Sequence, residues 1–166
     1  HHPGRGYGPV GERITLEVPA THVRVNMISA ISNEGTVRFM TYPGMLNAAV
    51  FLLFLERLVA GATRKILLIA DNLPAHKTPA VQAWVEAHRD RLEVFYLPPY
   101  APESNPVEYL NNDLKGQVNA AGLAADRPTL QSRVLGFMGK LSRLPGHVIS
   151  YFLQPQVQYA APAELI

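Results

Sequence analysis

Two carboxylates in this sequence lie where a regular element ends or begins. Asp71 directly follows the apolar run "KILLIA", and Glu108 lies three residues after Asn105 in "NPVEYL". The segment between them is long enough for a helix, a strand and a loop, so both acids can reach one crevice. Two carboxylates on rigid elements suit a hard divalent cation such as Mg²⁺ or Mn²⁺. Pairs of such cations stabilise the attacking and leaving oxygens in phosphoryl transfer.

Each carboxylate also has a purely structural interpretation. The pair Asp71–Asn72 is ordinary turn chemistry at the end of a strand. Asn105 is an expected helix N-cap with Pro106 as the first helical residue, and Glu108 then has the spacing of a capping box. Local sequence leaves both interpretations open. The combination of two acids at the ends of two elements favours a site.

Two other acids lie near Glu108 in the sequence. Glu103 is expected in a solvated loop. Asp113 follows Glu108 by five residues, so it points off a different face of the same helix. The spacing therefore favours Asp71 and Glu108 as the pair.

The first third of the chain has the alternation that is typical of β-strands. Apolar residues recur at every second position in 12–18 and again in 22–32. The turn "NEG" at 33–35 leads into 36–42, which predicts a β-hairpin with Gly35 where a positive φ is needed.

Helices and strands alternate in the rest of the chain. Asn47 and Thr78 are expected N-caps of two helices, and apolar runs at 64–71 and 92–98 predict buried strands. Further helices are expected from about Asn105, from about Thr129 to Arg143, and near 145–153. Because strands joined through a helix run parallel to a neighbour, this order predicts an α/β fold with a mixed sheet.

Length and composition limit the class of protein. The 166 residues, 48% of them hydrophobic, fit a single domain over 1–166 with its own core. Cysteine is absent, which excludes disulfides and thiolate metal sites. A net charge of +2 permits a nucleic-acid partner without requiring one. The sequence has neither a membrane-length apolar run nor a secretory signal, so we expect a cytoplasmic protein without a membrane partner.

Two blocks of the sequence carry a family resemblance. "LLIADNLPAHKTPAVQAW" and "FYLPPYAPESNPVEYLNNDLK" resemble the catalytic core of mariner-type transposases and their bacterial insertion-sequence relatives, which are DDE superfamily endonucleases. The resemblance implies a ribonuclease-H-like fold with helices on both faces of the sheet. It also implies three acids that hold two divalent metals, Mg²⁺ or Mn²⁺, for DNA cleavage and strand transfer in transposition. By resemblance, Asp71 is the second acid and Glu108 the third, and the prolines before Glu108 fix its position.

The sequence departs from the family pattern in one respect. The first acid of the family is an Asp on the first strand of the sheet, and this chain has no Asp before Asp71. We therefore expect a C-terminal fragment without the first catalytic strand or the DNA-binding domain, with weak metal binding and little or no cleavage. The strand of Asp71 would then lack a neighbour, unless "ERITLEV" or another chain supplies one, and an open edge promotes self-association.

The resemblance and the charge pattern suggest further site residues. His76, which matches the family's histidine, could contact phosphate or orient a ligand. Asn72 and Asn105 are candidates for supporting the carboxylates. Candidate DNA contacts are the cations that flank the two blocks, although a solvated rim is the alternative: Arg64, Lys65, Lys77 and Lys115.

Three functions stay open at this point. The first is a DNA transposase core, acting as a homodimer at the bacterial nucleoid in its full-length form. The second is a non-catalytic nucleic-acid-binding or assembly module with the same fold, which needs no metal. The third is a metal-dependent RNA nuclease on the same scaffold.

Overall fold

The computed structural model describes residues 12–18, by the path of the strand alone, and residues 23–161. The opening segment 1–11 lies outside the described residues. Strand β1 (Glu12–Val18) pairs antiparallel with β2 (Val23–Ile31), and β2 pairs antiparallel with β3 (Val37–Tyr42). The predicted hairpin is confirmed, since Ile31 pairs with Val37 across a turn in which Gly35 has φ 95°.

Asp71 of the predicted site follows a strand of a second sheet. Strands β4 (Ile66–Ala70) and β5 (Leu92–Tyr96) run parallel, and α2 (Pro79–Ala87) connects them. The amide of Leu97 extends the ladder by donating to the carbonyl oxygen of Ala70 at 2.8 Å. The residues that follow both strands therefore leave the sheet at the same edge.

Strand β4 has one partner strand within the described residues. Strand β1, which contains "ERITLEV", pairs with β2 and not with β4. A groove of about 700 Å³ separates β4 from the tip of the β2–β3 hairpin, with Ile31, Thr36 and Leu67 among its lining residues.

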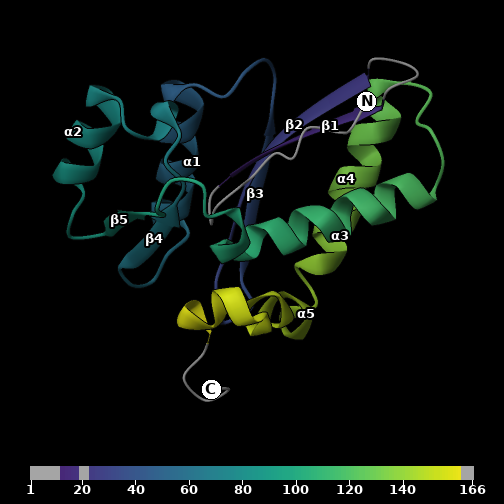
Figure 1. Ribbon diagram of the computed structural model, residues 1–166. Helices are drawn as coiled ribbons and strands as arrows, with labels where there is room; N and C mark the ends of the chain where they lie inside the picture. The colour runs from purple at the N-terminus through teal and green to yellow at the C-terminus, as the bar shows by residue number, and fades with distance from the viewer. Residues whose placement is uncertain (1–11, 19–22, 162–166) are drawn as a thin grey trace.

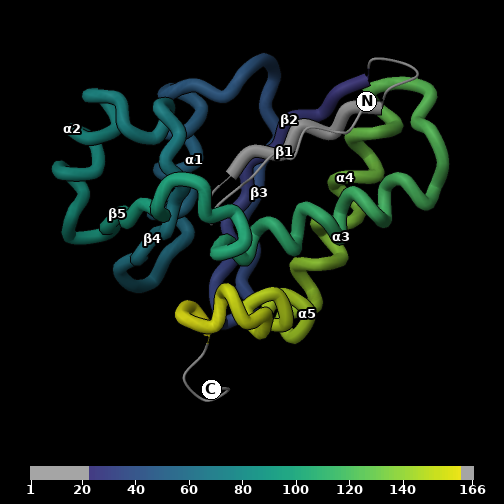
Figure 2. Tube along the Cα trace, in the orientation of Figure 1, coloured from purple at the N-terminus to yellow at the C-terminus, as the bar shows by residue number. Residues whose placement is uncertain are grey.

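Helices cover both faces of β2 and β3. Helix α1 (Ala48–Ala60) lies on one side, while α3 (Pro106–Ala120) and α4 (Arg127–Leu141) lie on the other (Figure 1). The short α5 (Pro145–Ser150) follows α4, and the Cα trace shows how it passes below α3 (Figure 2). Four short 3₁₀ helices complete the described chain: η1 (Pro74–His76), η2 (Pro102–Ser104), η3 (Tyr151–Leu153) and η4 (Pro155–Ala160).

Capping residues set the helix starts. The side chain of Asn47 accepts a hydrogen bond from the amide of Val50 at 2.9 Å, as its N-cap position predicts. Helix α4 begins at Arg127, two residues before the predicted start, because Asp126 caps it by accepting from the amide of Thr129 at 2.8 Å. Hydrogen bonding with the side chain of Thr129, and then with its backbone amide, lowers the pKa of Asp126.

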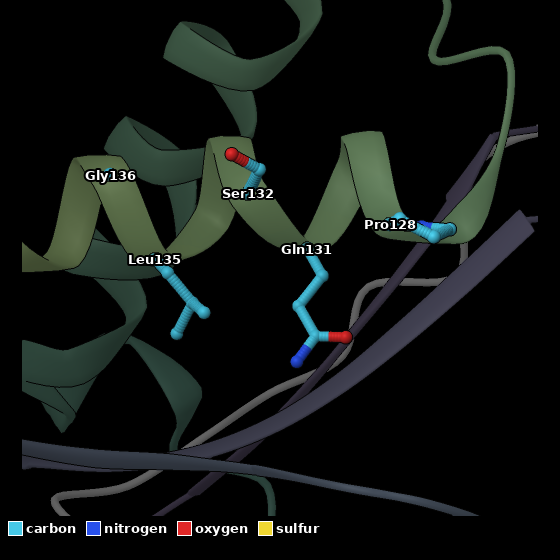
Figure 3. Close-up of a pocket in the computed structure, with 5 residues that line it drawn as sticks. All are labelled: Pro128, Gln131, Ser132, Leu135 and Gly136. Atoms are coloured by element: carbon cyan, nitrogen blue, oxygen red, sulfur yellow. The ribbon is translucent and has the colours of Figure 1, made fainter.

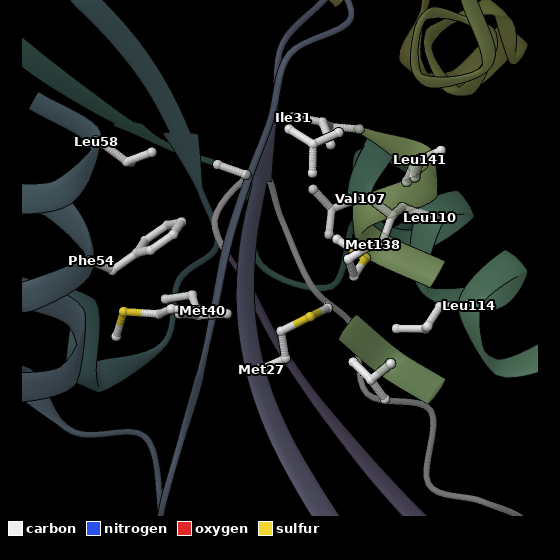
Figure 4. Packing of buried hydrophobic residues seen from close by; sticks show 14 of the residues in the cluster. Met27, Ile31, Met40, Phe54, Leu58, Val107, Leu110, Leu114, Met138 and Leu141 are labelled. Carbon is white, nitrogen blue, oxygen red and sulfur yellow. The ribbon is translucent and has the colours of Figure 1, made fainter. Parts of the chain in front are cut away.

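The hydrophobic core lies on both sides of the antiparallel strands. Met40 on β3 points toward Phe54 and Leu58 of α1, and Met27 on β2 points to the opposite side, toward α3 and α4 (Figure 4). This arrangement follows from the alternation of side chains along a strand. The α/β fold class is confirmed, with the strands arranged as one antiparallel and one parallel sheet rather than as a single mixed sheet.

The hairpin tip is held by the C-terminal part of the described chain. The Asn33 side chain donates to the carbonyl oxygen of Ala160 at 3.0 Å. A Cβ at position 35 would lie 2.6 Å from the Cβ of Pro145, so Gly35 is required by contact as well as by its φ. Among the described residues, no helix is long and apolar enough to span a membrane.

Candidate active site

Asp71 lies directly after β4 and its carboxylate is held by one oxygen. Oδ1 accepts a hydrogen bond from the amide of Leu73 at 3.1 Å and lies 2.9 Å from Nδ1 of His76. The structure gives no hydrogen bond to Oδ2 from any described residue. The side chain of Asp71 is 20% exposed, so one oxygen is held by the protein while the carboxylate keeps access to solvent.

His76 lies beneath this carboxylate and is fully buried. Its side chain has 0% exposure, and its ring packs on Phe51 of α1 with a centroid distance of 4.2 Å. A ring without solvent access does not reach a phosphate. The polar contacts that the structure gives this side chain are with Asp71, which agrees with an orienting role.

The end of β5 supports the same turn. The hydroxyl of Tyr96 donates to the carbonyl oxygen of His76 at 2.7 Å, and burial raises the pKa of Tyr96. Nζ of Lys77 lies 4.6 Å from the centroid of the Tyr96 ring, within cation–π range. Lys77 is therefore a cation close to Asp71, and its side chain is exposed.

Glu108 lies in the first turn of α3, as its spacing predicts. The Asn105 side chain caps the helix by accepting from the amide of Val107 at 3.2 Å. The Asn105 amide donates to the carbonyl oxygen of Pro102 at 3.1 Å, so this cap amide does not require Glu108 as an acceptor. The capping-box interpretation is therefore not needed to satisfy this amide. The approach of Glu108 to Asp71 stays a prediction.

The loop between β5 and α3 is held at both ends. It leaves β5 at the Leu97–Ala70 hydrogen bond, and the hydroxyl of Tyr159 donates to the carbonyl oxygen of Ser104 at 2.6 Å. Tyr100 lies between these points with φ 60°, the one non-glycine residue with positive φ in the described chain, and its side chain is fully exposed. Such a backbone costs on the order of 1–2 kcal/mol for a residue with a Cβ.

The predicted DNA-contacting cations fall in different places. Arg64 and Lys65 precede β4, about 20 Å along the strand from Asp71, and they pair with Glu34 and Glu93. Lys115 follows Glu108 by seven residues, two turns along the same face of α3. Lys77 and Lys115 are thus the two candidates that their elements place on the side of the predicted site. Asn72 is exposed next to Asp71.

Asp113 belongs to a separate polar cluster. Its Oδ2 lies 2.8 Å from Nε2 of His147 and accepts from the Tyr151 hydroxyl at 2.6 Å. Burial, this hydrogen bond and the negative charge of Asp113 raise the pKa of Tyr151. No local sequence pattern indicates these contacts, because the partners lie 34 and 38 residues apart. Asp113 links α3 to α5 and η3, which agrees with its expected exclusion from the acidic pair.

Neither of two hollows in the described part of the chain is lined by Asp71 or Glu108. A shallow hollow of about 600 Å³ runs along α4, with Pro128, Gln131 and Leu135 beside it (Figure 3), and no acid lines it. Within the described ranges no group of three or more acidic or histidine side chains is arranged to hold a metal. A cation at this site would therefore depend on Asp71, Glu108, water and substrate oxygens.

The structure adds supporting residues that the sequence did not indicate. Phe51 comes from α1 and Tyr96 from β5, and both contact His76. The sequence signal for Tyr96 was its place at the end of a strand parallel to the one that precedes Asp71. Phe51 had no local signal, since nothing near it in the sequence marks one apolar helical residue as a partner of a histidine.

Asp71 thus follows β4, and Glu108 lies in the first turn of the helix that follows β5. The family model for DDE superfamily endonucleases matches residues 1–131. The chain therefore belongs to the DDE superfamily endonuclease family, and the resemblance noted from the sequence is confirmed. No curated protein matches the chain.

Solved structures of transposases and integrases share the fold. The catalytic domain of the Mos1 mariner transposase is 14% identical with a TM-score of 0.62, and the match covers 90% of this chain and 80% of that one. The catalytic core domain of BIV integrase is 19% identical with a TM-score of 0.51, over 75% and 79% of the two chains. A chain of the simian T-cell lymphotropic virus intasome is 20% identical with a TM-score of 0.55; the match covers 81% of this chain and half of that one. At these identities the likeness shows the fold alone, and it confirms the ribonuclease-H-like class that the sequence resemblance implied.

Proposed function

We propose that this chain is the catalytic core of a DNA transposase, in which Asp71 and Glu108 hold divalent cations for strand cleavage and strand transfer. The observation that carries the proposal is the state of the Asp71 carboxylate. One of its oxygens is engaged by Leu73 and His76, and the other has no hydrogen bond within the described chain. Membership of the DDE superfamily endonuclease family supports the reaction class.

Mg²⁺ or Mn²⁺ is the cation we propose. Carboxylate oxygens are hard ligands, and Mg²⁺ is usually held by one or two carboxylates with water and phosphate oxygens in the remaining positions. Asp71 and Glu108 fit that description. The Mos1 catalytic domain, which shares this fold, was solved with Mg and with Mn. When bound, such a cation polarises a phosphodiester and activates the attacking oxygen.

The side chains of the chain itself place the substrate. Lys77 lies beside the Asp71 turn and Lys115 lies two turns along α3 from Glu108, so both can pair with phosphates of a DNA strand that crosses the site. Arg64 and Lys65 lie at the other end of β4 and are paired with acids. Only phosphates distant from the site are within their reach. A homodimer and a place at the bacterial nucleoid remain predictions.

Mn²⁺ titration followed by electron paramagnetic resonance tests the metal site. We expect Asp71→Asn and Glu108→Gln each to weaken Mn²⁺ binding by more than roughly tenfold, the lower end of what even indirect metal contacts contribute. Glu103→Gln removes a neighbouring acid from η2 and is the matched control, with unchanged binding. Wild-type affinity in either site variant would show that the two acids do not form the site.

Nucleic-acid binding separates the proposal from the RNA-nuclease alternative. Fluorescence anisotropy with a labelled DNA duplex and an RNA duplex of the same sequence should give tighter binding to DNA. We expect Lys77→Gln to weaken DNA binding more than Arg64→Gln does, because Lys77 lies beside Asp71. Equal affinity for both duplexes would contradict a DNA substrate.

A further inference from the structure

We propose that His76 is a positioning residue, which fixes the Asp71 carboxylate so that only Oδ2 is offered to a divalent cation. The inference deepens the proposed function and rests on it. It starts from a buried ionisable side chain that the site as described above does not otherwise use. His76 is fully buried, yet its Nδ1 lies 2.9 Å from Oδ1 of Asp71.

Two donors converge on the same carboxylate oxygen. The Leu73 amide donates to Oδ1 at 3.1 Å, and the imidazole Nδ1 approaches that oxygen more closely than it approaches the Asp71 backbone oxygen, at 3.4 Å. An oxygen that accepts two hydrogen bonds has little capacity left for a metal. Oδ2 is therefore the oxygen that remains for a cation, and the carboxylate binds through one oxygen rather than two.

The surroundings of Nε2 indicate which ring nitrogen of His76 carries the proton. Nε2 of His76 is buried with no hydrogen-bond partner in the described part of the chain. A proton on Nε2 would leave a buried donor unpaired, and it would leave Nδ1 as an acceptor facing the carboxylate. The arrangement is satisfied when the proton lies on Nδ1 and is donated to Asp71.

The ring is held from several directions, so this geometry is fixed before any ligand binds. Phe51 packs against it with an interplanar angle of 31°. The amide of His76 donates to the carbonyl oxygen of Leu73 at 3.0 Å, and Tyr96 donates to its carbonyl oxygen at 2.7 Å. These contacts come from α1, η1 and β5; two hold the backbone of His76, and Phe51 packs on the ring itself.

One-oxygen binding has a consequence for which cation is held. Ca²⁺ prefers more ligands and readily takes both oxygens of a carboxylate, whereas Mg²⁺ and Mn²⁺ accept single oxygens in octahedral geometry. With Oδ1 held by His76, Asp71 is a poorer ligand for Ca²⁺. Loss of the His76 donor should therefore reduce the preference for Mn²⁺ over Ca²⁺, in addition to weakening Mn²⁺ binding.

Two substitutions separate positioning from packing. His76→Asn places an amide nitrogen where Nδ1 was, so it keeps the donor and loses the rest of the ring. His76→Leu keeps more apolar bulk against Phe51 and loses the donor. His88→Leu is the control, because His88 also stacks on an aromatic ring, that of Trp84 at 3.9 Å, but has no contact with Asp71.

The decisive measurements are Mn²⁺ and Ca²⁺ titrations of the whole 166-residue chain, with thermal midpoints in EDTA. We expect His76→Leu to weaken Mn²⁺ binding about 10- to 100-fold, the usual effect of removing a side chain that orients a metal ligand. His76→Asn should recover most of that loss while being no more heat-stable than His76→Leu. Mn²⁺ affinities that follow the thermal midpoints across the variants would overturn the inference, and His88→Leu should leave affinity unchanged.

A metal-free measurement distinguishes this inference from the proposed function. Long-range ¹H–¹⁵N NMR spectra of the apo chain report which nitrogen of His76 carries the proton. A proton on Nδ1, whose exchange with solvent becomes faster in Asp71→Ala, is the expected result. A proton on Nε2 would overturn the positioning role whatever the chain binds. If Nδ1 is protonated and wild type binds no Mn²⁺, the metal site itself is wrong.

Discussion

Tyr96 donates its hydroxyl hydrogen to the backbone carbonyl oxygen of His76 at 2.7 Å, and so ties the end of β5 to the turn after β4. The bond joins two segments that are 20 residues apart in the sequence. It stabilises the turn that carries His76 without touching the Asp71 carboxylate. The end of the parallel sheet and the candidate site are therefore mechanically linked.

The first prediction concerns this link. Tyr96→Phe should lower the free energy of unfolding by about 1 kcal/mol, the usual contribution of one hydrogen bond, and should weaken Mn²⁺ binding less than His76→Leu does. Urea denaturation and the Mn²⁺ titration measure the two effects. An effect on Mn²⁺ binding as large as that of His76→Leu would mean that the turn collapses without Tyr96.

The second prediction concerns alkaline pH. Burial raises the pKa of Tyr96 and Tyr159, and burial together with Asp113 raises that of Tyr151. The folded chain thus keeps these protons at a pH where unfolded tyrosines, with pKa near 10, lose them. Their contribution to stability is complete below pH 10 and is lost as the pH rises above it. Urea denaturation between pH 9 and about 11 should show the decline.

Variants at two tyrosines test the source of that decline. Tyr151→Phe should cost about 1.5–3 kcal/mol at neutral pH, since its hydroxyl bonds a carboxylate, and should make the alkaline decline shallower. Tyr100→Phe alters a fully exposed hydroxyl and should match wild type in both respects. An unchanged alkaline slope in Tyr151→Phe would remove Tyr151 from the explanation.

The third prediction concerns cleavage. The chain has no Asp before Asp71, and the described residues contain no three-acid cluster. We therefore expect this 166-residue chain not to cleave supercoiled plasmid DNA in Mg²⁺ or Mn²⁺. Nicking that depends on metal and disappears in Asp71→Ala would show that two acids are sufficient.

The fourth prediction concerns the open edge of β4. Because Ile66 donates to Arg91 and Ala70 accepts from Leu97, the backbone groups of Leu67 and Ile69 face away from β5. No described strand pairs with them, and the Leu67 side chain is 64% exposed. Exposed apolar edges associate with other strands, so we expect self-association in sedimentation experiments.

A matched pair of lysine substitutions isolates that edge. Leu67→Lys should reduce the self-association, because a charge on an edge strand opposes pairing. Leu123→Lys alters a leucine that is also 64% exposed but lies in the loop after α3, and it should leave the self-association unchanged. A concentration-independent monomer in the wild type would contradict the prediction.

The sequence predicted those features that depend on neighbouring residues. Asn47, Thr78 and Asn105 each cap a helix as expected, because an N-cap bonds to an amide two or three residues away. Helix α4 begins two residues before the predicted start at Thr129, because Asp126 is its N-cap. The end of β4 at Asp71 was also predictable, from an apolar run that stops at an acid.

Contacts between distant segments were beyond sequence reasoning. His147 pairs with Asp113, a contact that no local pattern in the sequence indicates. The position of β1 beside β2 rather than β4 was left open, since its alternation fits either neighbour. The burial of His76 against Phe51 required the structure, because the five-residue spacing from Asp71 specifies a turn but not what covers it.

The hydrogen bond between Asn33 and Ala160 also has a consequence for how the chain is made. It joins residues that are 127 positions apart, so the tip of the hairpin leaves the ribosome long before its partner. At 5 to 20 residues per second the interval is roughly 6 to 25 s. The tip of the hairpin is therefore covered only after the last helical turns have been synthesised. Chaperones that shield nascent apolar strands would act during that interval, and their absence should lower the yield of folded chain.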